Sequence, residues 1–107
     1  MNNVREAKVF VAGHRGLVGS ALLRTLREVG CSNLVTRTHG ELDLCDGMLT
    51  RNFFERERPE IVILAAARVG GIQANIDYPA EFVRDNLAIQ TNVIHEAWRT
   101  GVSRLLL

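Results

Sequence analysis

The sequence predicts an α/β protein with a doubly wound parallel sheet, and three observations support this fold class. Short apolar runs alternate with helix-like segments along the chain. A glycine-rich turn separates the first apolar run from the first helix-like segment, and the run at 61–67 is apolar throughout. Alternating strands and helices form parallel sheets through right-handed crossovers. A strand that is apolar on both faces belongs inside such a sheet, because helices cover both sides.

The first half of the chain predicts two strands, a helix and a shorter strand. The run at 8–12 is rich in β-branched and aromatic residues, and 34–38 is a second strand. A helix is predicted over 17–29, ending at Gly30, which is a typical helix stop. Its predicted buried stripe consists of Val18, Leu22, Leu26 and Val29. A third, very short strand is predicted over 42–44.

The second half predicts two helices and two strands. Asp46 is a plausible N-cap for a helix over 47–58. The run at 61–67 is the fourth strand, a long helix covers 79–100, and a fifth strand begins at 104. The broad apolar face predicted for the long helix consists of Phe82, Val83, Leu87, Ile89, Val93, Ile94, Ala97 and Trp98.

Composition narrows the class of protein. The chain has 107 residues, which corresponds to one domain or part of one, and 47% of them are hydrophobic. The net charge is only +1, so nothing indicates a nucleic-acid or membrane partner. Cys31 and Cys45 form no CxxC pair, which predicts packing roles and no metal site. No signal-peptide pattern or membrane-length apolar run is present, so a cytoplasmic protein is expected.

A glycine motif between the first strand and the first helix carries the chemistry. It has the spacing G-x-x-G-x-x-G and consists of Gly13, His14, Arg15, Gly16, Leu17, Val18 and Gly19. The first glycine permits a sharp turn, the second lets a pyrophosphate approach the backbone, and the third permits close packing of helix and strand. The helix N-terminus then attracts the phosphates. The motif predicts a Rossmann-type dinucleotide site; the alternative is a glycine turn kept for packing.

The residues after the second strand predict which nicotinamide cofactor binds. An acidic residue there would bind the ribose 2′-hydroxyl of NAD. This chain instead has Arg37 and His39, and no carboxylate occurs before Glu41. Together with Arg15 in the glycine loop, these cations favour the 2′-phosphate of NADP. The alternatives are that Arg37 is only solvated and that His39 is an ordinary loop residue.

The glycine spacing resembles that of the extended short-chain dehydrogenase/reductases. Residues 11–21, 37–44 and 64–72, with Asn75, are most similar to the branch of that family that epimerises and reduces GDP-4-keto-6-deoxymannose with NADPH. The resemblance runs from about Val9 to the end of the chain. Its most specific part is the Arg-Val-Gly-Gly-Ile stretch at 68–72.

The resemblance implies roles for individual residues. Residues 13–19 would hold the pyrophosphate, with Arg15 on the 2′-phosphate. The segment 39–44 would line the adenine side, with Asp43 and Leu44 at its base. Ala65, Ala66 and Ala67 would pass under the cofactor. Some members carry Arg in place of His39, which is neutral much of the time near pH 7, so phosphate selectivity would rest mainly on Arg15 and Arg37.

The resemblance also implies catalytic residues that this sequence lacks. Such reductases use a Ser and a Tyr-x-x-x-Lys pair, but the single tyrosine is Tyr78 and the single lysine is Lys8. We therefore expect residues 1–107 to be the N-terminal part of an NAD(P)-binding domain, cut after the start of the fifth strand, without a substrate domain and inactive alone. GDP-4-keto-6-deoxymannose would bind only a full-length protein.

Three further expectations remain open at this stage. The chain could instead be a stand-alone nucleotide-binding or interaction module. It could also be a fragment of another NAD-dependent nucleotide-sugar epimerase or dehydratase. The apolar end at Leu105, Leu106 and Leu107 favours a fragment, because an apolar strand at the edge of a sheet is expected to be covered by further strands. In related reductases the helix equivalent to 79–100 often packs against a partner subunit, so a homo-oligomer through that helix is a further expectation.

Overall fold

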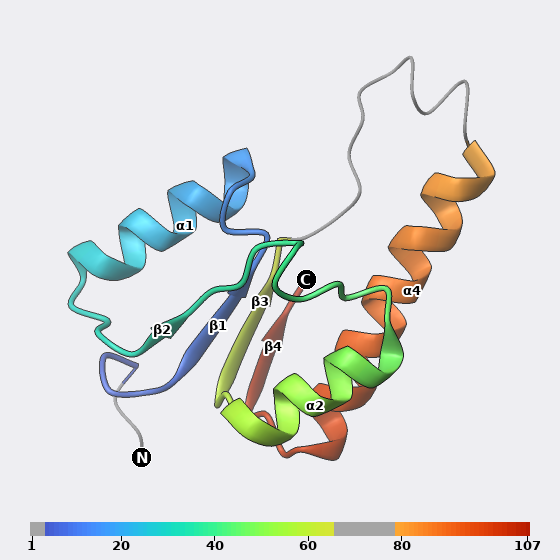
Figure 1. Ribbon diagram of the computed structural model, residues 1–107. Helices are drawn as coiled ribbons and strands as arrows, with labels where there is room; N and C mark the ends of the chain where they lie inside the picture. Colours follow the sequence, from blue (N-terminus) through green and yellow to red (C-terminus); the bar gives the residue numbers. More distant parts are fainter. Residues whose placement is uncertain (1–3, 66–78) are drawn as a thin grey trace.

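The protein folds around a four-stranded parallel sheet whose strand order is β2-β1-β3-β4 (Figure 1). The computed structural model describes residues 4–65 and 79–107. Its elements, in chain order, are β1 Val9–Ala12, α1 Leu17–Glu28, β2 Leu34–Val35, α2 Gly47–Glu57, β3 Ile61–Leu64, α4 Pro79–Arg99 and β4 Arg104–Leu106. Helix α1 covers one face of the sheet, and α2 and α4 cover the other. The predicted doubly wound α/β class is confirmed.

The two central strands supply both halves of the core. Every residue of β1 is buried, and β1 pairs with β3 in parallel from Val9 opposite Ile61 to Ala12 opposite Leu64. Because successive strand side chains point to opposite faces, Val9 and Val11 pack toward α1, whereas Phe10 and Ala12 pack toward α2 and α4. A β-branched, apolar sequence is therefore required on both faces.

Aromatic packing fixes the α2 side of the core. The rings of Phe53 and Phe54 on α2 lie 4.5 Å and 6.0 Å from the ring of Phe10, measured between centroids. All three side chains are fully buried. Val93 and Ala97 of α4 join the same cluster. Tilted and edge-on ring pairs of this kind add about 0.5–1.5 kcal/mol each beyond the burial of their area.

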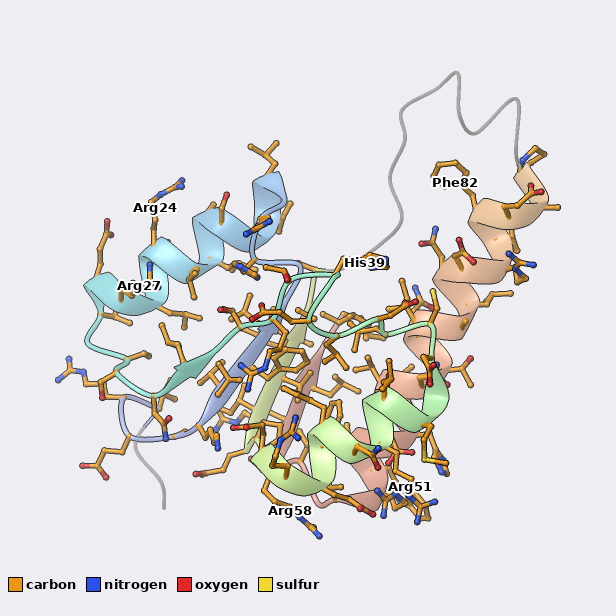
Figure 2. The ribbon with its side chains drawn as sticks, viewed as in Figure 1. Arg24, Arg27, His39, Arg51, Arg58 and Phe82 are labelled. Carbon is orange, nitrogen blue, oxygen red and sulfur yellow. The ribbon has the colours of Figure 1, made fainter. Side chains whose placement is uncertain are left out.

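The face that helix α1 turns to the sheet is rotated from the predicted one and shares Leu26 with it. Its buried residues are Gly19 and Leu23, with Leu26 packed against the same cluster. Val18 and Val29 of the predicted stripe are 63% and 50% exposed, so that part of the prediction is wrong. The reason is that Gly19 meets the end of β1 directly, which rotates 19, 23 and 26 inward. Arg24 points away from the sheet, as Figure 2 shows.

Helix α4 buries only half of its predicted apolar face. Four members of that face are buried, namely Phe82, Ile89, Val93 and Ala97. The other four remain exposed: Val83 at 58%, Leu87 at 57%, Ile94 at 41% and Trp98 at 77%. A prediction that Trp98 lies in the core is therefore wrong. One side of α4 packs on the sheet and α2, and the opposite side is an exposed apolar stripe.

The segment after β2 also differs from the prediction. Strand β2 is only two residues long, and 42–44 is not a strand: 42–43 has no regular secondary structure and a turn follows at 44–45. Leu42 and Leu44 are nevertheless buried in the core. The alternation of apolar residues therefore correctly indicated burial, but a turn closed by Thr38 prevents strand pairing there. Strand β3 ends at Leu64, and the predicted continuation through Ala66 and Ala67 lies outside the described residues.

The predicted cap of α2 is confirmed and can be tested. One carboxylate oxygen of Asp46 accepts hydrogen bonds from the backbone N–H groups of Met48 and Leu49, both at 3.0 Å. Asp46→Ala should lower the free energy of unfolding by about 1 kcal/mol, because two N–H groups lose their acceptor. Urea unfolding measures the change. Asp46→Asn is the control and should stay near wild type; equal stability of Asp46→Ala and wild type would contradict the assignment.

Candidate dinucleotide-binding site

The candidate site begins where β1 ends and the chain turns into α1. Gly13 has φ 86°, a backbone conformation that residues with a Cβ rarely adopt. The backbone N–H of Gly16 donates to the Gly13 carbonyl at 3.1 Å, which closes the turn. The glycine loop therefore emerges at the carboxyl edge of the parallel sheet, where ligands bind in doubly wound folds.

Gly19 brings α1 into backbone contact with this turn. A Cβ at position 19 would overlap the carbonyl group of Gly13 and crowd the Cα of His14. No side chain can be accommodated without moving the helix or the turn. The contact places the first turn of α1 beside the end of β1, as the motif predicts for its third glycine.

The N-terminus of α1 has no side-chain cap within the described chain. Its N-cap is Gly16, and no acidic residue lies in its first turn. Helix α2, by contrast, is capped by Asp46. The first N–H groups of a helix need acceptors and carry partial positive charge. A Cβ at Gly16 would make only ordinary contact with the Gly13 oxygen, at 3.4 Å. The protein's own packing thus leaves that glycine unexplained, whereas an approaching phosphate would explain it.

The loop after β2 is closed by reciprocal hydrogen bonds. The backbone N–H of Thr38 donates to the Glu41 carboxylate at 2.7 Å, and the N–H of Glu41 lies 3.2 Å from the Thr38 hydroxyl oxygen. The Thr38 carbonyl accepts from Glu41 and Leu42. His39 is exposed at the tip of this loop, near the carboxyl edge of the sheet (Figure 2).

The positive charges of Arg37 and Arg15 act on the Glu41 carboxylate in this loop. The Thr38 backbone N–H lowers the pKa of Glu41 most, followed by the Thr38 side chain and then the guanidinium charges of Arg37 and Arg15. Arg15 of the glycine loop therefore acts electrostatically on the loop after β2. The two segments that the sequence assigned to one cofactor form one electrostatic neighbourhood.

The two arginines differ in their availability. Arg15 is exposed. Arg37 lies 3.3 Å from the Glu57 carboxylate, donates to the Thr36 carbonyl at 2.8 Å, and stacks over the Phe53 ring at 5.3 Å. The guanidinium of Arg37 is neither merely solvated nor free, because α2 already holds it. Its predicted contact with a 2′-phosphate stays a prediction.

The match to known proteins decides the family. Residues 9–107 match the family model described as the NAD dependent epimerase/dehydratase family. The chain belongs to this family.

The relatives of this epimerase/dehydratase chain are longer proteins. It is 60% identical over 102 residues to GDP-L-fucose synthase 1 of Arabidopsis thaliana and 50% identical over 101 residues to the GDP-L-fucose synthase of Escherichia coli. These matches cover 95% and 94% of this chain but 32% of each relative. The chain therefore spans about a third of the length of the curated relatives it matches.

A solved structure shares the same fold. The GDP-mannoheptose C4 reductase from Campylobacter jejuni, determined with NADP bound, superposes with a TM-score of 0.92 at 39% identity. That match covers 97% of this chain and 31% of the reductase. The Rossmann-like fold predicted from the sequence is thereby confirmed, as is the resemblance to nucleotide-sugar enzymes.

In this epimerase/dehydratase chain, the predicted adenine-side residues lie partly inside the core. The Leu44 side chain is buried, and its carbonyl accepts from the Asn92 amide at 2.9 Å. A carboxylate oxygen of Asp43 accepts from the N–H of Cys45 at 3.0 Å. Ala65 is half-buried and its N–H bonds to the Ala12 carbonyl at 2.9 Å. Ala66 and Ala67 lie outside the described residues, and adenine contact stays a prediction.

The sequence did not predict the ion pairs behind the site. Glu57, at the end of α2, lies 2.9 Å from the Lys8 ammonium, and this contact is the main cause that lowers the Glu57 pKa. Glu57 also holds Arg37. A second group joins Arg99 of α4 to Glu55 at 2.9 Å and Glu96 at 2.7 Å. The pairs of Glu57 with Lys8 and Arg37 and of Glu55 with Arg99 tie α2 to its neighbours, and sequence spacing gave no signal for them. Among these pairs, only Glu96–Arg99 has the i,i+3 spacing of a helical ion pair.

Other classes of site receive no support in the described ranges. Among residues 4–65 and 79–107, no group of three or more His, Cys, Asp and Glu residues is placed to hold a metal ion. Within the same ranges, no helix has the length and apolarity needed to cross a membrane.

The two inner glycines of the motif should separate packing from ligand binding. Gly19→Ala should lower the free energy of unfolding by about 1–3 kcal/mol, since the new Cβ overlaps the Gly13 backbone. Gly16→Ala should leave stability near wild type but weaken NADPH binding, because the motif predicts that a pyrophosphate approaches the backbone at this glycine. Urea unfolding and fluorescence titration with NADPH provide the two measurements. Unchanged NADPH affinity in folded Gly16→Ala would contradict the phosphate assignment.

Proposed function

We propose that this chain is the NADP(H)-binding part of a nucleotide-sugar epimerase/reductase of the GDP-L-fucose synthase kind, acting on GDP-4-keto-6-deoxymannose in a full-length protein. The observation that carries the proposal is the glycine turn at the carboxyl end of β1. Helix α1 begins directly after this turn, and its N-terminus has no side-chain cap. Its relatives support the substrate class, because those named above are GDP-L-fucose synthases and a GDP-heptose reductase.

The charges around the site support NADP(H) rather than NAD(H). In the proposed complex, the pyrophosphate lies against residues 13–19 and the 2′-phosphate lies near Arg15. Arg15 is exposed, and His39 stands on the neighbouring loop. The related C. jejuni reductase binds NADP. A dianionic phosphate gains more from a guanidinium than a ribose hydroxyl does.

The chain's own residues would bind and orient the cofactor. NADPH supplies the hydride when bound. The glycine turn would fix its pyrophosphate, and Ala65 would lie beneath it at the end of β3. The 107 residues contain one tyrosine, Tyr78, and one lysine, Lys8, so the Tyr-x-x-x-Lys pattern does not occur in them. We propose that this part contributes cofactor binding and not the proton donor.

The cofactor assignment is tested by titrating the chain with NADPH and NADH. NADPH should bind more tightly, and Arg15→Ala should reduce that preference about tenfold, since a charge-assisted hydrogen bond contributes about 1.5–3 kcal/mol. Arg37→Ala should also reduce the preference, but by less, because Glu57 already holds Arg37. Equal or tighter binding of NADH by the wild type would overturn the assignment.

The exposed apolar stripe of α4 supports a further part of the proposal, namely that copies of this chain associate with one another. Val83, Leu87, Ile94 and Trp98 follow one another at helical spacing and are 41–77% exposed. Thr91, Ile94, His95 and Trp98 form a mainly apolar, open surface on this side. Exposed apolar patches of this kind mark protein interfaces. We propose that two copies associate through α4.

Sedimentation at several protein concentrations tests the association. The wild type should form a concentration-dependent dimer, and Trp98→Ser should shift it toward monomer, because the most exposed aromatic side chain of the stripe is lost. Val29→Ser, at the exposed end of α1, is the matched control and should behave as wild type. A wild-type monomer at every concentration would contradict the proposal.

A further inference from the structure

The proposed cofactor site contains a carboxylate as well as cations. Glu41 follows β2 by six residues and is exposed. Its carboxylate accepts the Thr38 N–H at 2.7 Å, and its own N–H lies 3.2 Å from the Thr38 hydroxyl oxygen. A long, exposed side chain would otherwise sample many rotamers. These contacts hold the Glu41 carboxylate against the turn that follows β2.

The same contacts make Glu41 part of the backbone structure of this turn. The Thr38 carbonyl accepts from the N–H groups of Glu41 at 3.0 Å and Leu42 at 2.9 Å. Leu42 is buried in the core, which anchors the far end of the turn. His39 and Gly40 lie between and are exposed. The turn thus presents His39 to solvent while Thr38 and Glu41 hold its base.

The charge of Glu41 lies at the same edge of the sheet as the arginine proposed to bind the 2′-phosphate, because β1 and β2 are parallel neighbours and Arg15 and Glu41 follow their carboxyl ends. Arg15 and Arg37 both help to lower the Glu41 pKa, after the two Thr38 contacts. Glu57 already holds Arg37, whereas no ion pair joins Arg15 to another residue within 4–65 or 79–107. A carboxylate at the edge where the phosphate is proposed to bind opposes the attraction of the cations, because like charges repel.

We propose that Glu41 is a specificity-determining residue of the cofactor site. It holds the turn after β2 in place through Thr38, and its negative charge limits the preference for a 2′-phosphate that Arg15 creates. The inference rests on the proposed function, since it presumes that NADP(H) binds at this edge. It differs from a purely structural role, which would change the affinities for NADPH and NADH alike.

Three variants separate the two roles. Glu41→Gln keeps an oxygen to accept the Thr38 N–H but removes the charge. Glu41→Ala removes both. Glu28→Gln removes the same charge at the far end of α1 and controls for net charge. Each chain is titrated with NADPH and with NADH, at about 0.15 M and about 1 M salt, because salt screens exposed charges.

The expected result is a change in the ratio of the two affinities. Glu41→Gln should increase the preference for NADPH over NADH about two- to fivefold at the lower salt concentration, and the increase should shrink at the higher one. Glu41→Ala should show the same shift while binding both cofactors more weakly, since the turn loosens. Glu28→Gln should keep the wild-type ratio.

Other outcomes contradict distinct claims. A ratio in Glu41→Gln that is unchanged or lower than in the wild type would overturn the inference while leaving the proposed function intact. An equal shift in Glu28→Gln would also overturn it, because net charge would then be the cause. A wild-type chain that binds neither NADPH nor NADH would contradict the proposed function itself and the inference with it.

Discussion

The structure depends on the backbone contact between Gly19 and Gly13. Because a Cβ at position 19 would overlap the Gly13 carbonyl group, the first turn of α1 can approach the end of β1 only with glycine there. This approach sets the rotation of α1 and so decides that Leu23 and Leu26 pack on β1. It also directs the N-terminus of α1 along the carboxyl edge of the sheet. One packing constraint therefore creates a core face and fixes where the N-terminus of α1 lies.

The interactions that stabilise this fold and the segments proposed to bind the cofactor occupy different places in it. The aromatic cluster of Phe10, Phe53 and Phe54 and the ion pairs of Glu57 hold the α2 side together. The glycine turn and the loop at 38–41 have exposed residues and few core contacts. Arg37 connects the two regions, because it leaves the end of β2 but its guanidinium is held by α2. The parallel sheet permits this separation of core and loops, because its strands end, and the segments that lead to the next helices begin, at one edge.

Much of the fold could be predicted from local sequence. Buried strands such as β1 and β3 are apolar throughout, Asp46 stands where a helix cap is needed, and the glycine spacing has a direct steric meaning. The errors have physical reasons. The stripe containing Val18 assumed an ideal face for α1, whereas a contact with β1 decides its rotation. The segment 42–44 alternates like a strand but lies outside the sheet.

The sequence predicted which segments form the candidate site, but not which partners its charged side chains contact. Sequence order brings the glycine turn and the end of β2 to one edge, because adjacent parallel strands share a carboxyl end. It could not show that Glu57, twenty residues away, holds Arg37. Nor could it show that Glu41 bonds back to Thr38 beside the cations, since that geometry exists only after the turn has formed.

Amide hydrogen exchange of the chain with and without NADPH tests the central claim most directly. If the carboxyl edge binds the cofactor, NADPH should slow exchange in residues 13–20 and 38–42 and leave the exposed stripe of α4 unchanged. NADH at equal concentration should protect the same segments less. Protection confined to α4, or none at saturating NADPH, would contradict the account.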